Sequence, residues 1–260
     1  MTVFDLYVGK VAGYVECLRA KGREVRTFQA PVSSARLSQK LPFRVGPGAN
    51  PGIILRGDTR VELGNPEVGS ASLMLLTDSP ATLKDGRITL IGPDIPESAG
   101  ASLPFGQVLM LGGAQLADQD AEALQQVQFV GDQIEGYMMR GVSRRIWSRV
   151  STEAVAKGMC FNLLGQALMA VCRSASPKLE AMEIIFVTSG KEDLEPLAGW
   201  SVQLQKIARE ITKENWRIKG YDIDCASNCG TCQDQVVCGE IKEVLRERQL
   251  NDPTLEGVST

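Results

Sequence analysis

Hydrophobic and polar residues follow two different periods along this chain, and the changes of period separate helical from strand-like stretches. Apolar positions near helical spacing predict a first helix over residues 4–19, and a short strand is expected over 24–28. The stretch PFRVGPGANPG at 42–52 is rich in proline and glycine, which interrupt regular structure. It marks the first expected boundary between parts of the fold.

Short strand-like runs bounded by turn signals fill the region after this boundary, over residues 53–112. The runs are IILRG, RVELG, SLMLLTD, RITLIG and FGQVLML. Amphipathic spacing then predicts helices over about 120–139, 151–157, 162–172 and 189–215. The last of these begins with a capping box, Ser189-Gly190-Lys191-Glu192, and the run EIIFVTS before it is expected to be a buried strand. A sheet packed by helices follows from this order.

Composition and charge exclude several classes of function. The chain has 260 residues and a net charge of only -3, which gives no general electrostatic reason to expect nucleic acid or an acidic membrane as a partner. It contains no histidine, so Ser-His and Cys-His nucleophile pairs and HExxH zinc sites are excluded. The start of the chain has no secretory leader, and no apolar run reaches the roughly 18 residues of a membrane span. We therefore expect a cytoplasmic protein without a membrane span.

Four cysteines near the C-terminus form the densest motif, with the spacing C-x3-C-x2-C-x5-C. They are Cys225, Cys229, Cys232 and Cys238. One loop with this spacing can surround a cubane with four thiolates, so a [4Fe-4S] cluster is the first hypothesis. Structural zinc is the alternative, although zinc sites typically use two short pairs separated by a longer loop. A disulfide or redox switch is the third interpretation, and a reducing compartment disfavours it.

The first three of these cysteines also match a radical-SAM spacing. That chemistry needs an iron with an open coordination position and a barrel after the motif. Here Cys238 can close the coordination, and only 22 residues follow it. We therefore expect a closed metal site. The remaining cysteines, Cys17, Cys160 and Cys172, stand singly in apolar contexts where buried, inert thiols are the usual finding.

Four arginines lie within ten residues around one tryptophan, Trp147. They are Arg140, Arg144, Arg145 and Arg149. Guanidinium groups bind phosphate oxygens in bidentate fashion and an indole offers a face for adenine stacking, so the segment suits a ligand such as coenzyme A. The alternatives are a solvated basic face beside a core tryptophan and a docking patch for an acidic partner.

Several blocks in the middle of the chain resemble a known family. "VELGNPEVGSASLMLLTD", "DGRITLIGPDI", "LPFGQVLML" and "WSRVSTEAVAKG" occur in the order found in acetyl-CoA synthase, the β subunit of the carbon monoxide dehydrogenase/acetyl-CoA synthase system. The resemblance covers about half of the chain, from Val61 to Thr188. It implies the family's middle α/β domain, to which coenzyme A binding has been assigned.

The resemblance also implies residue roles. The family's tryptophan and the arginine two residues later match Trp147 and Arg149, while Arg144 and Arg145 keep the basic character without the family's spacing. A further family arginine is replaced by Cys160. Nothing matches the cysteine spacing of the family's nickel-bearing domain, so we expect no acetyl-forming A-cluster and no self-sufficient enzyme.

The expected fold class is α/β, with a mixed sheet packed by helices and a small C-terminal four-cysteine iron-sulfur segment. The expected parts divide the whole chain. They are an N-terminal helix and strand segment over 1–50, an acetyl-CoA-synthase-middle-domain-like α/β domain over 51–218, a cysteine-rich cluster-binding segment with a final helix over 219–250, and a flexible tail over 251–260.

The functional hypothesis is an accessory relative of the acetyl-CoA synthase β subunit that serves anaerobic one-carbon (Wood-Ljungdahl) or acyl-CoA metabolism. It would bind a [4Fe-4S] cluster and either coenzyme A or a partner, namely carbon monoxide dehydrogenase, a corrinoid protein or another redox subunit. The alternatives are an electron-transfer subunit that uses the middle domain as a docking scaffold, and a zinc-stabilised adaptor.

Overall fold

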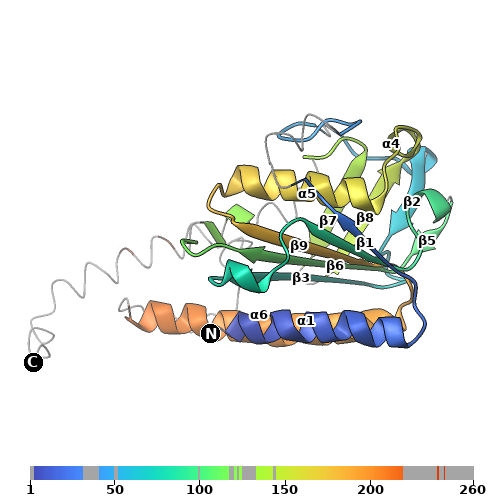
Figure 1. Cartoon of the computed structure of the whole chain (residues 1–260). Helices are drawn as coiled ribbons and strands as arrows, with labels where there is room; N and C mark the ends of the chain where they lie inside the picture. Colours follow the sequence, from blue (N-terminus) through green and yellow to red (C-terminus); the bar gives the residue numbers. More distant parts are fainter. Residues whose placement is uncertain are drawn as a thin grey trace, which may run out of the picture. The chain divides into compact units, whose positions relative to one another are not determined.

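The computed structural model describes most of the first 218 residues. The described residues are 3–31, 41–49, 52–98, 100–116, 120–121, 123–124, 133–142 and 145–218, together with Gly239 and Glu243. The chain divides into two compact units, Met1–Ser201 and Val202–Thr260. The first unit holds both β-sheets and the arginine and tryptophan segment (Figure 1).

A five-stranded mixed sheet is the centre of the first unit. Its strands, in spatial order, are β1 (Val25–Gln29), β4 (Arg87–Ile91), β9 (Ala181–Val187), β6 (Phe105–Gly112) and β3 (Ser70–Thr77). β4 runs parallel to β9 and β3 parallel to β6, whereas β6 and β9 are antiparallel and β1 is antiparallel to β4. The predicted mixed sheet is confirmed.

Strands β6 and β9 are buried at every residue, which explains why their sequences are continuous apolar runs rather than alternating ones. Helix α5 (Phe161–Ala175) covers one face, where a Cβ added at Gly165 would lie 2.8 Å from the Ile88 side chain. The opposite face is covered by helix α1 (Val3–Ala20) (Figure 1). The 3-10 helix η4 (Glu192–Leu194) lies on this sheet as well, since a Cβ added at Gly106 of β6 would lie 2.8 Å from the Leu194 side chain. The sheet is therefore the middle layer of three.

A second, four-stranded sheet carries the candidate ligand segment. Its strands, in order, are β5 (Ser102–Leu103), β2 (Thr59–Leu63), β8 (Arg145–Ser151) and β7 (Tyr137–Val142). Residues along β8 alternate between buried and partly exposed, which is the pattern of a sheet with one covered face. Buried side chains of this sheet, including Val61, Ile146 and Val150, join the core of the main sheet. The other face of β8 is left for polar groups.

Three phenylalanine rings hold the layers together at the centre of the core. The Phe161 ring of α5 lies 4.8 Å from that of Phe186 on β9 and 5.9 Å from that of Phe105 on β6, measured between centroids. All three side chains are fully buried. Aromatic pairs at this spacing contribute about 0.5–1.5 kcal/mol beyond the area they bury.

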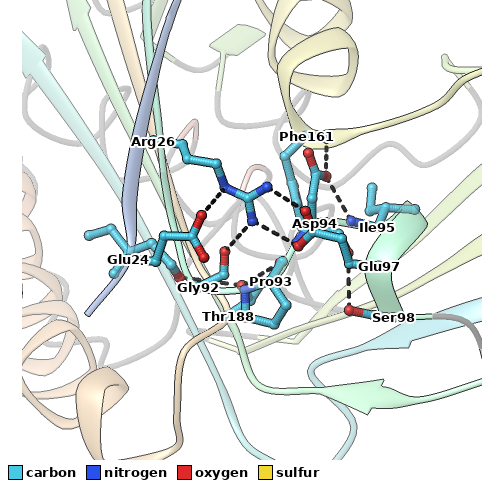
Figure 2. Close-up of polar contacts among 11 residues, drawn as sticks. Glu24, Arg26, Gly92, Pro93, Asp94, Ile95, Glu97, Ser98, Phe161 and Thr188 are labelled. Carbon is cyan, nitrogen blue, oxygen red and sulfur yellow. Dashed lines mark hydrogen bonds and ion pairs between the residues drawn. The ribbon is translucent and has the colours of Figure 1, made fainter. Parts of the chain in front are cut away.

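The buried carboxylate of Asp94 joins α5 to the end of β4 (Figure 2). Its Oδ1 atom accepts hydrogen bonds from the backbone N–H groups of Ile95, at 2.7 Å, and Phe161, at 2.9 Å. Beside it, Arg26 of β1 binds both carboxylate oxygens of Glu97, at 2.6 and 2.9 Å, and donates to the Gly92 carbonyl at 2.8 Å. These contacts make Asp94 a structural anchor.

Two sequence predictions of secondary structure were wrong. The helix expected over about 120–139 does not reach its predicted end, because Tyr137–Val142 forms β7 and pairs with β8. The run IILRG is not a strand, since a 3-10 helix (Arg56–Asp58) occupies its end. The local apolar pattern alone did not determine the structure in either place. For Tyr137–Val142, pairing with the strand that follows it, β8, decides in favour of a strand.

The other predicted elements within the described residues are present. The helix near 151–157 is α4 (Thr152–Ala156), and the last helix is α6 (Glu195–Ile218), which η4 precedes. The capping box predicted over Ser189–Glu192 was wrong, because the N-cap of η4 is Lys191 without a side-chain capping hydrogen bond and the Ser189 hydroxyl donates to Asp193 Oδ2 at 2.5 Å. The final helix expected near the C-terminus falls almost wholly outside the described residues. None of the described helices is long and apolar enough to cross a membrane.

Replacement of Asp94 tests its anchoring role. Asp94→Ala leaves the N–H groups of Ile95 and Phe161 without their acceptor inside the protein, so we expect a loss of about 1–3 kcal/mol in the free energy of unfolding. Urea denaturation measures this loss. Asp94→Asn keeps an acceptor oxygen and should lose clearly less; equal losses in the two variants would contradict the hydrogen-bond explanation.

The Arg26–Glu97 pair predicts a dependence of stability on pH. Hydrogen bonds from Arg26 and from the Asp94 backbone lower the pKa of Glu97 from 4.5 to about 2. The unfolded chain therefore takes up this proton first as pH falls, so the pair stabilises the fold above pH 4.5 and the contribution is lost between pH 4.5 and 2. Glu97→Gln should flatten this part of the stability profile in urea titrations, whereas the exposed control Glu67→Gln should follow the wild type.

Candidate functional site

The carboxylate of Glu62 organises the outer face of the second sheet. Its Oε1 atom accepts hydrogen bonds from the indole Nε1 of Trp147, at 3.1 Å, and from Nε of Arg149, at 3.2 Å. Its Oε2 atom accepts from Nδ2 of Asn65 at 3.1 Å. The register of the two strands explains the contact between Glu62 and Arg149, since Glu62 on β2 lies directly opposite Arg149 on β8. One carboxylate thus fixes both residues that the family resemblance singled out.

Arg149 is committed to contacts within the protein. Its guanidinium carbon lies 4.6 Å from the centre of the Trp147 ring, and its Nη1 atom donates to the Ile54 carbonyl at 3.1 Å. Only 18% of its side chain is exposed. Arg149 therefore covers part of the indole and orients it, while its remaining capacity for a ligand is small.

The charge of Glu62 is maintained by its neighbours. Burial by itself would raise the pKa of this carboxyl group, but hydrogen bonds from Asn65, Trp147 and Arg149, together with the positive charge of Arg149, outweigh it and lower the pKa below its usual value. The group is therefore ionised near neutral pH. An ionised carboxylate is the stronger acceptor for both donors, so the arrangement persists over the physiological range.

Two exposed arginines flank Trp147 on the same face. Arg140 of β7 lies directly opposite Trp147 in the antiparallel pair, and Arg145 precedes it by two residues on β8, so all three side chains leave the sheet on one side. Both arginines are exposed. We call Glu62, Arg140, Arg145, Trp147 and Arg149 the arginine face. It joins an oriented indole to exposed guanidinium groups, which is the chemistry that binds phosphorylated aromatic ligands.

Other predicted site residues lie outside the described residues. These are Arg144 and the four cysteines Cys225, Cys229, Cys232 and Cys238. In the part of the chain that is described, no group of three or more cysteine, aspartate or glutamate side chains is arranged to hold a metal ion. The metal hypothesis therefore stays a prediction from the spacing of the cysteines.

The three single cysteines differ in their surroundings. Cys172 is buried, and burial raises the pKa of its thiol to about 12, as expected for an inert thiol. Cys160 precedes α5, where burial and the nearby Asp94 carboxylate raise its thiol pKa. Cys160 is only partly buried, so the prediction that all three are buried is confirmed for Cys172 alone, and it was wrong for Cys17, which is exposed on α1. Its position on the outer side of an amphipathic helix explains the difference.

The role of Glu62 was not predicted from the sequence, because its partner Trp147 is 85 positions away along the chain. Arg140 was named only as one of four clustered arginines, without a position relative to Trp147. The antiparallel pairing of β7 with β8 places Arg140 opposite Trp147. The incorrect helix over about 120–139 concealed this pairing.

Comparison with known proteins relates this geometry to a family. The family model described as the CO dehydrogenase/acetyl-CoA synthase complex beta subunit matches residues 41–193, which include every member of the arginine face. The beta 1 subunit of the acetyl-CoA decarbonylase/synthase complex of Methanosarcina thermophila is 26% identical over 197 residues, 75% of this chain and 41% of the relative. Its counterpart from Methanosarcina acetivorans is 28% identical over 198 residues, again 75% of this chain and 41% of the relative.

A bacterial relative shows the same partial coverage. The alpha subunit of the carbon monoxide dehydrogenase/acetyl-CoA synthase of Moorella thermoacetica is 28% identical over 210 residues, which is 78% of this chain and 27% of the relative. The chain therefore spans less than half the length of these curated relatives. Since the family model matches more than half of its residues, the chain belongs to the family of the beta subunit of CO dehydrogenase/acetyl-CoA synthase complexes.

Proposed function

We propose that the protein is an accessory member of this family that binds coenzyme A or a coenzyme A thioester on the arginine face. The observation that carries the proposal is the oriented indole of Trp147, which Glu62 and Arg149 hold between the exposed Arg140 and Arg145. Coenzyme A offers an adenine for stacking and phosphates for the guanidinium groups. Because Arg149 is bound to Glu62, Arg140 and Arg145 are the arginines assigned to the phosphates.

Assembly into a larger complex is the second part of the proposal. The curated relatives are named as subunits of acetyl-CoA decarbonylase/synthase or carbon monoxide dehydrogenase/acetyl-CoA synthase complexes. By analogy, this protein would work beside a carbon monoxide dehydrogenase, a corrinoid protein or another redox subunit. The cysteine motif supports a [4Fe-4S] cluster that relays electrons or stabilises the C-terminal segment. The chemistry of the donor set, four thiolates in one short loop, fits such a cluster.

Calorimetric titration of coenzyme A tests the arginine face. The wild-type protein should show saturable binding, and Trp147→Ala should weaken it by about 5- to 150-fold, since stacking of a base on an aromatic side chain contributes about 1–3 kcal/mol. Trp200→Phe is the control, because Trp200 lies away from the arginine face and packs edge-on against Tyr7 and Tyr14 of helix α1. Its affinity should equal that of the wild type.

A charge change provides a second readout of the same proposal. Arg140→Glu should weaken binding and reduce its dependence on salt concentration, because a phosphate contact is lost. The exposed control Lys21→Glu has the same change of charge on another part of the protein and should bind normally. Absence of saturable binding by the wild type would reject the coenzyme A proposal and leave the docking-scaffold alternative.

Metal analysis tests the cysteine motif. Protein purified without oxygen should contain about four iron and four sulfide per chain and give a paramagnetic resonance signal after reduction. Cys229→Ala should lose most of the iron, whereas Cys17→Ala, which alters an exposed single thiol, should keep it. One zinc per chain without labile sulfide would instead favour the structural adaptor.

A further inference from the structure

A pocket of about 590 Å³ opens at the end of strand β8, and we call it the β8 pocket. Its walls come from four stretches of the chain. The lining residues fall within 43–49, 53–58, 135–136 and 151–157. This volume falls within the roughly 300–1,000 Å³ of small-molecule sites. All lining residues belong to the first compact unit.

The pocket differs from the arginine face in its charge. Two basic and three acidic side chains line it, so its net charge is negative. Glu135 stays ionised, since hydrogen bonds from the Arg44 backbone and the Lys157 side chain lower its pKa to about 2. Lys157 lies between Glu135, at 3.0 Å, and Glu153, at 2.7 Å. The cations of the pocket are thus neutralised, and a phosphate group would be repelled there.

The β8 pocket and the arginine face are continuous along one strand. Trp147, Arg149 and Ser151 lie on the same face of β8, and the last of them lines the pocket. Ser151 lies four positions after Trp147 along the strand, a distance of about 13 Å at 3.3 Å per residue. Ile54 belongs to both sites, because its carbonyl accepts from Arg149 and the residue also lines the pocket.

Two exposed apolar side chains lie next to Ile54 along the chain. Ile53 lines the pocket and is 66% exposed, and Leu55 nearby is 63% exposed. These are two of the five large hydrophobic side chains that are exposed among the described residues. A ligand that passes from the indole into the pocket would cover Ile53. The part of such a ligand that enters should be uncharged, partly apolar and able to form hydrogen bonds.

We propose that the β8 pocket receives the pantetheine arm of a coenzyme A thioester whose nucleotide lies on the arginine face, an inference that depends on the proposed function above. The arm is uncharged, carries methyl groups for contact with Ile53, and has two amides for the polar walls. The phosphates stay at the guanidinium groups, where the charge favours them. The separation of charge between the two sites therefore assigns the phosphates to the arginine face and the uncharged arm to the pocket.

Two ligands and one variant test this arrangement on the full-length protein by calorimetry. Adenosine bisphosphate carries the nucleotide end of coenzyme A without its arm, so the wild type should bind acetyl-CoA about tenfold more tightly or better, a difference of about 1.4 kcal/mol or more. Gly57→Phe should remove this advantage while leaving the affinity for adenosine bisphosphate unchanged. A Cβ at Gly57 meets no atom within 4 Å, so the new side chain enters open space at the pocket.

Matched variants separate a local effect from a general one. Gly13→Phe adds the same ring on the exposed side of α1, where a Cβ also meets nothing within 4 Å, and should bind both ligands normally. Ile53→Asp, at an exposed position where folding is not at risk, should also weaken acetyl-CoA alone.

Four outcomes would overturn the inference. Equal affinities of the wild type for acetyl-CoA and adenosine bisphosphate, or normal acetyl-CoA binding by both Gly57→Phe and Ile53→Asp, would show that the arm lies elsewhere while the coenzyme A proposal stands. Loss of adenosine bisphosphate binding in Gly57→Phe would place the nucleotide in the pocket instead. Failure of both ligands to bind the wild type would reject the proposed function together with the inference.

Discussion

Burial of β6 and β9 on both faces is the constraint on which the rest of this fold depends. Two adjacent strands with no exposed residue need cover on each side, which α5 supplies on one face and α1 on the other. Asp94 and the phenylalanine cluster then fix α5 against the sheet. Because the second sheet shares this core, the candidate ligand residues are placed on a rigid support.

The second sheet illustrates how one side chain can define a site. Glu62 meets two residues of β8 that are separated by a single position, and each would otherwise be free to adopt several rotamers. The arginines of this face therefore have two different roles. Arg149 orients the indole, whereas Arg140 and Arg145 present their charges to solvent. The sequence alone does not show which arginine has which role, since this depends on the register of β2, β8 and β7.

Local signals explain which features were predictable. Helices α1, α4 and α5 and the strands of the main sheet have clear periodicity or bounded apolar runs, and the family resemblance was confirmed by the match over residues 41–193. Strand β7 could not be recognised, because its Tyr-Met-Met run also fits a helix and only its pairing with β8 decides. The Glu62–Trp147 contact and the β8 pocket arise from segments far apart along the chain, so no local pattern reveals them.

The hydrogen bond from Trp147 to Glu62 also bears on the thermodynamics of recognition. An indole on an open sheet surface would normally lose rotational freedom when a ligand stacks on it, at a cost of about 0.5–1.5 kcal/mol for an immobilised side chain. Here the ring is held before any ligand arrives, so most of that entropy is already lost on folding. The face is preorganised, and association would require little structural adjustment of the protein.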